Sequence, residues 1–167
     1  THYVRFIQCT SSDCSTSVTN NITNIGVSQY ADNMGLSIGP DGNPDIVYHS
    51  TASGNVEYVS CANAACSSIT TQSITASGNY SSIATGSDNF ARILDRNTSN
   101  YPIYYQCTNA SCSTSNSFTI ESNSAAWTSI AMGTDGFPRL LYTTLAGATK
   151  YIVCQSADCT SRVSTTL

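Results

Sequence analysis

The eight cysteines of this chain constrain its fold more than any other feature, because they occur as four pairs with the same C-x4-C spacing. Two strands joined by a four-residue turn bring their flanking residues opposite each other, with Cβ atoms about 4.5–5.5 Å apart, close to what a disulfide needs. We therefore predict four hairpin-stapling disulfides and an oxidising, extracellular or cell-surface location. The predicted bonds are Cys9–Cys14, Cys61–Cys66, Cys107–Cys112 and Cys154–Cys159.

The same cysteines could instead bind metal, since two C-x4-C knuckles supply the four thiolates of a structural zinc site. Against this reading, the four loops contain no histidine and belong to separate repeats that need not converge. The C-x-x-C spacing of redox pairs is also absent. We predict disulfides, with no metal and no cofactor.

A repeat of about 47 residues underlies the cysteine pattern. The first cysteines of successive pairs are 52, 46 and 47 residues apart, and Asp41, Asp88 and Asp135 follow one another at intervals of 47. Around these aspartates the chain reads MGLSIGPDGNPDIVY, YSSIATGSDNFARIL and WTSIAMGTDGFPRLLY. The predicted units of this single repeat domain are a half repeat with linker at 1–27, which holds a third and a fourth strand, and whole repeats at 28–74, 75–121 and 122–167.

Each repeat has the composition of four short β-strands, because runs of 5–8 residues rich in Val, Ile, Tyr and Thr are bounded by turn residues. No helical i, i+3, i+4 pattern is sustained. Four strands in a unit of this length match one blade of a β-propeller. We predict an all-β, β-propeller-like array of four-stranded antiparallel blades, with about three and a half repeats.

The predicted strands are apolar on both faces, as expected for sheets packed between neighbouring sheets. The first strands carry Leu36, Ile38, Ile83, Ile130 and Met132. The second strands carry Ile46, Val47, Ile93, Leu94, Leu140 and Leu141. An aromatic residue stands three positions before the first cysteine of every pair, at Phe6, Tyr58, Tyr104 and Tyr151.

The units resemble the secreted bacterial β-propeller repeats of the form S-[IL]-A-x-x-x-D-G-x-P-x-[IL]-x-Y, followed by a strand and C-x4-C. The resemblance covers nearly the whole chain and implies the fold without implying a specific activity. The middle unit departs from the pattern, because Asn89, Phe90 and Ala91 replace Gly-x-Pro and Asp95 replaces the Tyr. The sequence also differs from sialidase-type Asp-boxes and lacks the WD-repeat and kelch signatures.

The repeat count leaves the predicted array open. A closed propeller needs at least about four blades, and an uncovered sheet edge or blade face recruits another chain. Either the chain is a fragment of a longer array, or neighbouring subunits complete it. A head-to-tail contact that does not close produces a filament, so we expect self-association into a homo-oligomer or filament.

The recurring aspartates could bind calcium or stabilise their turns. Calcium takes six to eight oxygen ligands, usually from several carboxylates, whereas each turn offers one aspartate, with Asp45 nearby in the first turn only. We predict that Asp41, Asp88 and Asp135 bond the amides of their own turns.

No catalytic constellation stands out in the sequence. The two histidines (His2 and His49) and the two glutamates (Glu57 and Glu121) form no evident pair, and no Gly-x-Ser-x-Gly elbow occurs. A sialidase-like site would need an arginine cluster, and we expect the arginines to occupy unrelated positions of the units. These arginines are Arg5, Arg92, Arg96, Arg139 and Arg162. We predict that the protein is not an enzyme.

Four N-x-[ST] sequons make Asn21, Asn79, Asn97 and Asn109 candidate N-glycosylation sites. The chain contains 14 Asn, 27 Ser and 22 Thr, so chance alone yields about this number and only their placement is informative. We expect Asn21 and Asn79 in linkers between units, Asn97 in a hairpin loop and Asn109 in a C-x4-C turn, all of them exposed.

Aromatic side chains that stay exposed could bind sugar. Tyr30, Tyr80 and Trp127 each open a predicted first strand. Aromatic residues in such positions usually pack in the core, so we predict a packing role for all three.

Composition excludes several classes of partner. Only 10% of the residues are charged, the formal net charge is −4, and Lys150 is the only lysine, which argues against nucleic acid and anionic membranes. No apolar run approaches the ~20 residues of a membrane span. The favoured function is a non-enzymatic extracellular structural repeat protein, a subunit or segment of a self-assembling cell-surface filament that carries glycans. The alternatives are a carbohydrate-binding or adhesive β-propeller and, less favoured, a fragment of a glycoside-active enzyme.

Overall fold

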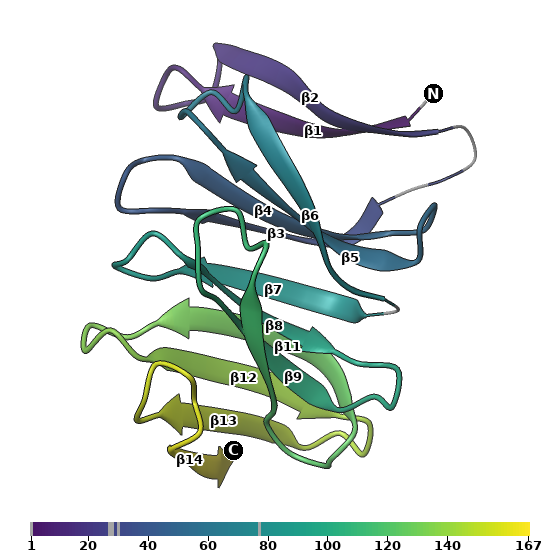
Figure 1. Ribbon diagram of the computed structural model, residues 1–167, viewed down its shortest axis with the longest axis vertical. Helices are drawn as coiled ribbons and strands as arrows, with labels where there is room; N and C mark the ends of the chain where they lie inside the picture. Colours follow the sequence, from purple (N-terminus) through teal and green to yellow (C-terminus); the bar gives the residue numbers. More distant parts are fainter. Residues whose placement is uncertain (1, 27–28, 30, 77) are drawn as a thin grey trace.

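The fold consists of β-strands stacked in four antiparallel sheets, and it is known from a computed structural model that describes residues 2–26, 29, 31–76 and 78–167. There are 14 strands, and the described residues contain no helix. Figure 1 shows the sheets following one another along the long axis, with the N-terminal sheet at one end and the C-terminal sheet at the other. The prediction of an all-β repeat fold is confirmed.

The first sheet has two strands and the other three have four strands each. Sheet one pairs β1 (His2–Cys9) with β2 (Ser17–Gly26). Sheet two contains β3 (Ala31–Ile38), β4 (Pro44–Ser50), β5 (Asn55–Cys61) and β6 (Ile69–Ala76). Sheet three contains β7 (Asn79–Thr85), β8 (Ala91–Arg96), β9 (Pro102–Cys107) and β10 (Ser115–Thr119). Sheet four contains β11 (Ala125–Met132), β12 (Pro138–Thr144), β13 (Thr149–Cys154) and β14 (Arg162–Thr166).

The strands of each sheet lie side by side in chain order. The first strands β3, β7 and β11 are therefore edge strands, and they also pack against one another from sheet to sheet. Strand β1 ends at the first cysteine of a C-x4-C pair, as β5, β9 and β13 do. Sheet one thus corresponds to the third and fourth strands of the other sheets.

The turn between the first and second strands is the same in all three four-stranded sheets. Gly42 and Gly136 adopt φ of +79° and +81°, and Asn89 adopts +60° at the same position of the middle repeat. Glycine and asparagine tolerate this left-handed conformation better than other residues. Asp41, Asp88 and Asp135 each accept a hydrogen bond from the backbone N–H two residues later, in Asn43, Phe90 and Phe137.

The four C-x4-C disulfides form between the predicted partners, but the predicted cross-strand geometry is wrong. Cys9 pairs with Ser17 in the β-ladder, while Cys14 lies inside the connecting loop. The second cysteine of every pair has a positive φ, between 51° and 58°, and its N–H donates to the carbonyl three residues earlier. This tight turn folds the loop back onto the end of the strand. The disulfide therefore lies within a hairpin loop that is longer than the four residues between the two cysteines.

The hydrophobic core lies between consecutive sheets. Neighbouring residues of a strand point to opposite faces, so Ile46 packs toward the preceding sheet and Val47 toward the following one. Between sheets one and two lie Val4, Phe6, Ile46 and Val59. Between sheets two and three lie Val47, Tyr58, Ile83 and Tyr105. Between sheets three and four lie Leu94, Tyr104, Leu140 and Ile152.

Two buried tyrosines connect their own sheet to the disulfide loop of the next sheet. The Tyr58 hydroxyl lies 2.9 Å from the carbonyl oxygen of Ala110, and the Tyr104 hydroxyl donates to the carbonyl of Ala157 at 2.7 Å. Burial raises the pKa of both phenols, which keeps them protonated as donors. Each carbonyl stands three residues after the first cysteine of its pair, so the two contacts are repeats of one interaction.

We predict that Tyr104→Phe lowers the free energy of unfolding by about 1 kcal/mol, the usual net value of one hydrogen bond. Tyr151 occupies the same position in the last sheet but has no following sheet in the described chain. At dilutions where the protein is monomeric, Tyr151→Phe should therefore leave stability unchanged. Urea unfolding of both variants measures the difference, and equal effects would contradict the proposed role of the tyrosine.

Candidate functional site

The outer face of the last sheet exposes an apolar surface, which we call the C-terminal face. Leu141 pairs with Tyr151 across β12 and β13, and Val153 pairs with Val163 across β13 and β14. These four side chains share one face, because directly paired residues and residues two apart in a strand point the same way. Leu141 and Val163 are exposed, while Tyr151 and Val153 are half-buried.

The same positions are covered in the earlier sheets. Leu141 is 39% exposed, whereas Val47 and Leu94, which precede it by 94 and 47 residues in the repeat, are 0% exposed. Each of those side chains packs on the following sheet. The side chains of the C-terminal face therefore occupy positions that pack against a following sheet in the earlier repeats.

The opposite end of the stack has a complementary surface, which we call the N-terminal face. Ile7 on β1 is 57% exposed, although Val59, Tyr105 and Ile152 at the same position before their cysteines are all buried. Cys9 and Cys14 are exposed, while the other six cysteines are buried. A preceding sheet covers this position wherever one exists.

Trp127 and Tyr80 form an aromatic pair at the edge strands, and the prediction that Trp127 packs in the core is wrong. Trp127 is 62% exposed, and its ring meets that of half-buried Tyr80 edge to face, with centroids 4.5 Å apart. The Arg96 guanidinium lies 4.4 Å from the Tyr80 ring centroid. Tyr30 lies outside the described residues.

Irregular backbone explains why these aromatic side chains leave the core. Tyr80 adopts φ of +64°, and a register shift interrupts the β11–β12 ladder between Ala125 and Trp127. Asn33, at the equivalent position of the preceding repeat, also has a positive φ of 50°. These irregularities turn the side chains away from the regular alternation of a strand. A small hollow of about 90 Å³ lies among them, beside Met34 and Thr128.

Of the four candidate glycosylation sites, Asn21 is exposed and the other three are half-buried. Asn21 lies within β2 and Asn79 begins β7, so the expectation that both lie in linkers is wrong. The side-chain oxygen of Asn79 accepts a hydrogen bond from the side-chain amide of Asn33, and the side-chain oxygen of Asn97 accepts hydrogen bonds from the N–H groups of Ser99 and Tyr101. The Asn109 amide nitrogen itself donates to Ser113 and Thr114. Glycosylation of Asn109 would remove at least part of this bonding.

Two arginines occupy one position of the repeat, contrary to our expectation that the arginines are unrelated. Arg92 and Arg139 are 47 residues apart, and they form ion pairs with Asp88 at 2.7 Å and Asp135 at 2.5 Å. Contact with Arg139 lowers the pKa of the Asp135 carboxyl. Aligning the sequence by its period would have revealed this pairing. Each of the two arginines bonds to the turn aspartate of its own repeat, so these ion pairs do not bring the arginines together in one cluster.

Among the described residues, the carboxylates of Asp45 and Asp95 are buried, and each accepts a hydrogen bond from at least one hydroxyl group. Asp45 lies 2.6 Å from the Tyr58 hydroxyl and 2.8 Å from that of Thr85, so it connects sheet two to sheet three. Burial raises the pKa of Asp45. Asp95 stands where the other repeats have Tyr48 and Tyr142, and it accepts a bond from Ser81 at 3.0 Å.

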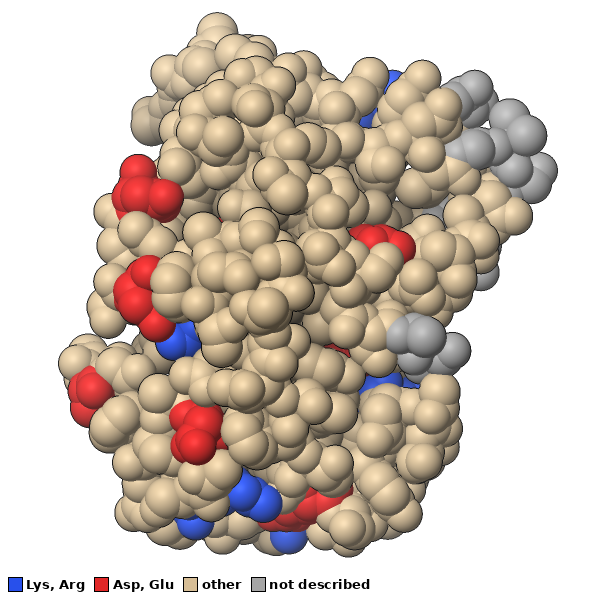
Figure 2. All heavy atoms as spheres, viewed as in Figure 1, with Lys and Arg blue, Asp and Glu red and all other residues tan. Residues whose placement is uncertain are grey.

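The surface is mostly uncharged. Figure 2 shows only a few acidic and basic side chains on a largely neutral face. Within the described chain, no group of three or more His, Cys, Asp or Glu residues is arranged to hold a metal ion. The described segments likewise contain no helix long and apolar enough to cross a membrane. The four disulfides indicate an oxidising environment.

Comparison with known proteins adds no family to this description. No protein-family model matches the chain, and no curated protein matches it.

We predict that Asp95→Asn stabilises the protein at neutral pH. Burial raises the pKa of Asp95 from 3.8 to about 6, against hydrogen bonds from Ser81 and the amides of Arg96 and Asn79 that lower it. The folded state therefore binds this proton more tightly than the unfolded state, and stability falls as pH rises from about 4 to about 6. At pH 8 the variant should be more stable than the wild type by up to about 3 kcal/mol, at about 1.4 kcal/mol per unit.

Chemical denaturation of both proteins at pH 4 and pH 8 measures this effect. The two proteins should differ little at pH 4, where Asp95 is protonated in the folded state. The comparison cancels the contributions of other titrating groups, because both proteins contain them. A variant that is destabilised equally at both pH values would contradict the account of a buried, desolvated charge.

Proposed function

We propose that this chain is a non-enzymatic, extracellular structural repeat protein whose sheets are the blades of a β-propeller-like array, and that it is a subunit or segment of a self-assembling surface filament. The observation that carries the proposal is the C-terminal face, because Leu141 is exposed where Val47 and Leu94 are fully buried by a following sheet. A surface built like a sheet-to-sheet interface favours a further sheet as its partner.

The two terminal faces complement each other in this proposal. Leu141 and Tyr151 of one copy would pack on Ile7 and the Cys9–Cys14 loop of the next copy, as Val47 and Tyr58 pack on Tyr105 and the Cys107–Cys112 loop. The Tyr151 hydroxyl would then donate to the carbonyl of Ser12, which stands three residues after Cys9. The two faces lie at opposite ends of the stack (Figure 1), so this contact is head-to-tail and extends into a filament.

Further support for a structural role comes from the chemistry of the chain. The surface has few ions to desolvate on assembly, since only 10% of residues are charged. The buried carboxylates bond to hydroxyl groups and belong to the packing between and within sheets. Asn21 is the most accessible of the four candidate sites for a covalent glycan, because its side chain is exposed.

We predict that Leu141→Lys abolishes assembly or weakens it at least about tenfold, because it buries a charge in the interface. The fold of the monomer should persist, since the side chain is already exposed. Leu145→Lys is the matched control, because Leu145 is also exposed but lies beyond the end of β12 and outside the C-terminal face. Light scattering and electron microscopy measure assembly. A wild-type protein that stays monomeric at high concentration would contradict the proposal.

Carbohydrate binding is the second candidate, and the exposed Trp127 beside Tyr80 favours it. Aromatic faces with neighbouring amides, here Asn33 and Asn79, suit a sugar ring that has both apolar and hydroxyl surfaces. Glycan-array binding that is lost in Trp127→Ala and kept in Leu145→Lys would support this candidate over a purely structural role.

A further inference from the structure

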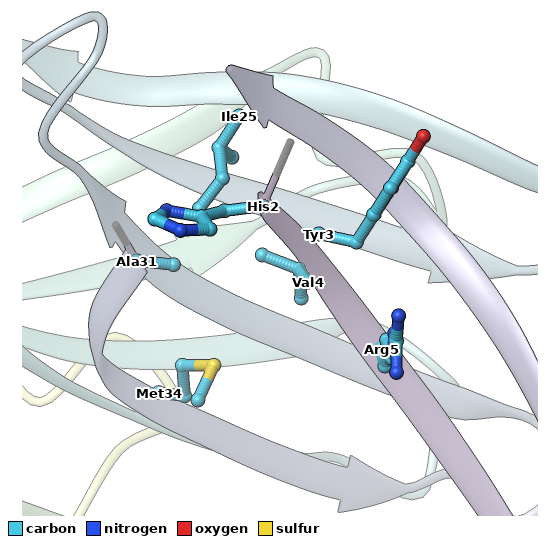
Figure 3. Close-up of a pocket in the computed structure, with 7 residues that line it drawn as sticks. All are labelled: His2, Tyr3, Val4, Arg5, Ile25, Ala31 and Met34. Carbon is cyan, nitrogen blue, oxygen red and sulfur yellow. The ribbon is translucent and has the colours of Figure 1, made fainter. Parts of the chain in front are cut away.

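A groove runs along the first sheet, between strand β1 and strand β3. Two adjoining hollows of about 410 and about 290 Å³ form it, and Val4, Arg5 and Met34 line both. Figure 3 shows the larger hollow, with Val4 on β1 and Met34 on β3 at its sides. The groove is a second exposed surface at this end, and it adjoins the N-terminal face, because Ile7 also lines the smaller hollow.

The floor of the groove exposes apolar side chains at positions that are buried in the later sheets. Leu36 on β3 is 56% exposed, whereas Ile83 and Ile130 at the same repeat position are 7% and 8% exposed. Ile83 is covered by β3 and β4, and Ile130 by β7 and β8. In both cases the cover is the first hairpin of the preceding sheet. Met34 and Ile38 are exposed on the same face of β3.

The wall of the groove is an unpaired strand edge. Strands β5, β9 and β13, which correspond to β1, each pair with a second strand on one side and a fourth strand on the other. Among the described residues, β1 pairs with β2 alone. The edge of β1 thus offers backbone donors and acceptors to a further strand.

We propose that this groove binds a β-hairpin with the sequence chemistry of the repeat's own first half, supplied from outside the described residues, which pairs with β1 and covers Leu36. The inference rests on the proposed function, since it identifies the partner of one end of the array. Every hairpin of this type in the described chain, β3–β4, β7–β8 and β11–β12, is already paired with its own third strand. None of them is free to fill the groove without leaving its own sheet.

The repeat also fixes the register of the bound hairpin. Val47 pairs with Tyr58, Leu94 with Tyr104, and Leu141 with Tyr151. The third-strand residue in each pair stands three positions before the cysteine, where β1 has Phe6. The bound hairpin therefore sets its equivalent of Leu141 opposite Phe6, antiparallel to β1.

A synthetic peptide with the sequence of residues 123–144 tests the proposal, because it contains the β11–β12 hairpin. The peptide is added to the intact protein, and binding is followed by calorimetry and hydrogen exchange. We expect saturable binding of one peptide per protein and slower exchange of the amides of His2–Cys9. Leu36→Glu in the protein, or Leu141→Glu in the peptide, should weaken binding at least about tenfold, since each puts a charge in the apolar contact. The control Leu145→Glu in the protein should bind normally.

Three results would overturn the proposal. They are an absence of binding at millimolar peptide, protection of β13 and β14 in place of β1, and slower exchange of β1 without peptide because two copies pair through this edge. The outcome is separable from the proposed assembly. A protein that fails to form filaments can still bind the peptide, and a filament can still form without binding it.

Discussion

The packing of each sheet on the next is the interaction on which the rest of this structure depends. Each sheet is apolar on both faces, so a sheet standing alone would leave one or both apolar faces in water. Val47 and Leu94 become fully buried only because another sheet follows. The buried tyrosines Tyr58 and Tyr104 add a polar contact to the next disulfide loop. At the ends of the stack, side chains at the equivalent positions are exposed to solvent. The terminal faces are therefore the main candidates for binding a partner.

Much of this fold could be predicted from the sequence because the same strand and turn positions recur in several repeats. The 47-residue spacing of Asp41, Asp88 and Asp135 identified the first turn, and alternating apolar runs identified the strands. The spacing of the cysteines identified the disulfide partners but not their geometry. The left-handed backbone at Cys14 and its equivalents places the bond inside the loop, and spacing alone carries no information about φ.

The candidate site was less predictable because exposure depends on neighbours that a repeat unit does not encode. Leu36 and Ile83 read alike in the sequence, yet only Ile83 is covered by the first hairpin of a preceding sheet. Trp127 looked like a core residue, and a local register shift turns it outward. The pairing of Arg92 and Arg139 with the turn aspartates follows from the period of the repeat, because the two arginines are 47 residues apart. The structural role, the glycan sites and the propeller arrangement stay predictions.

The contact between sheets is tested most directly by nuclear Overhauser effects in solution. The account predicts cross-peaks from the Tyr58 ring to Ala110 and from the Tyr104 ring to Ala157, because each hydroxyl lies within 3 Å of the partner's carbonyl oxygen. These residues are 52 and 53 positions apart in the chain, so no local structure can produce such signals. Well-resolved spectra of the folded protein that lack both sets of cross-peaks would contradict the stacking of the sheets.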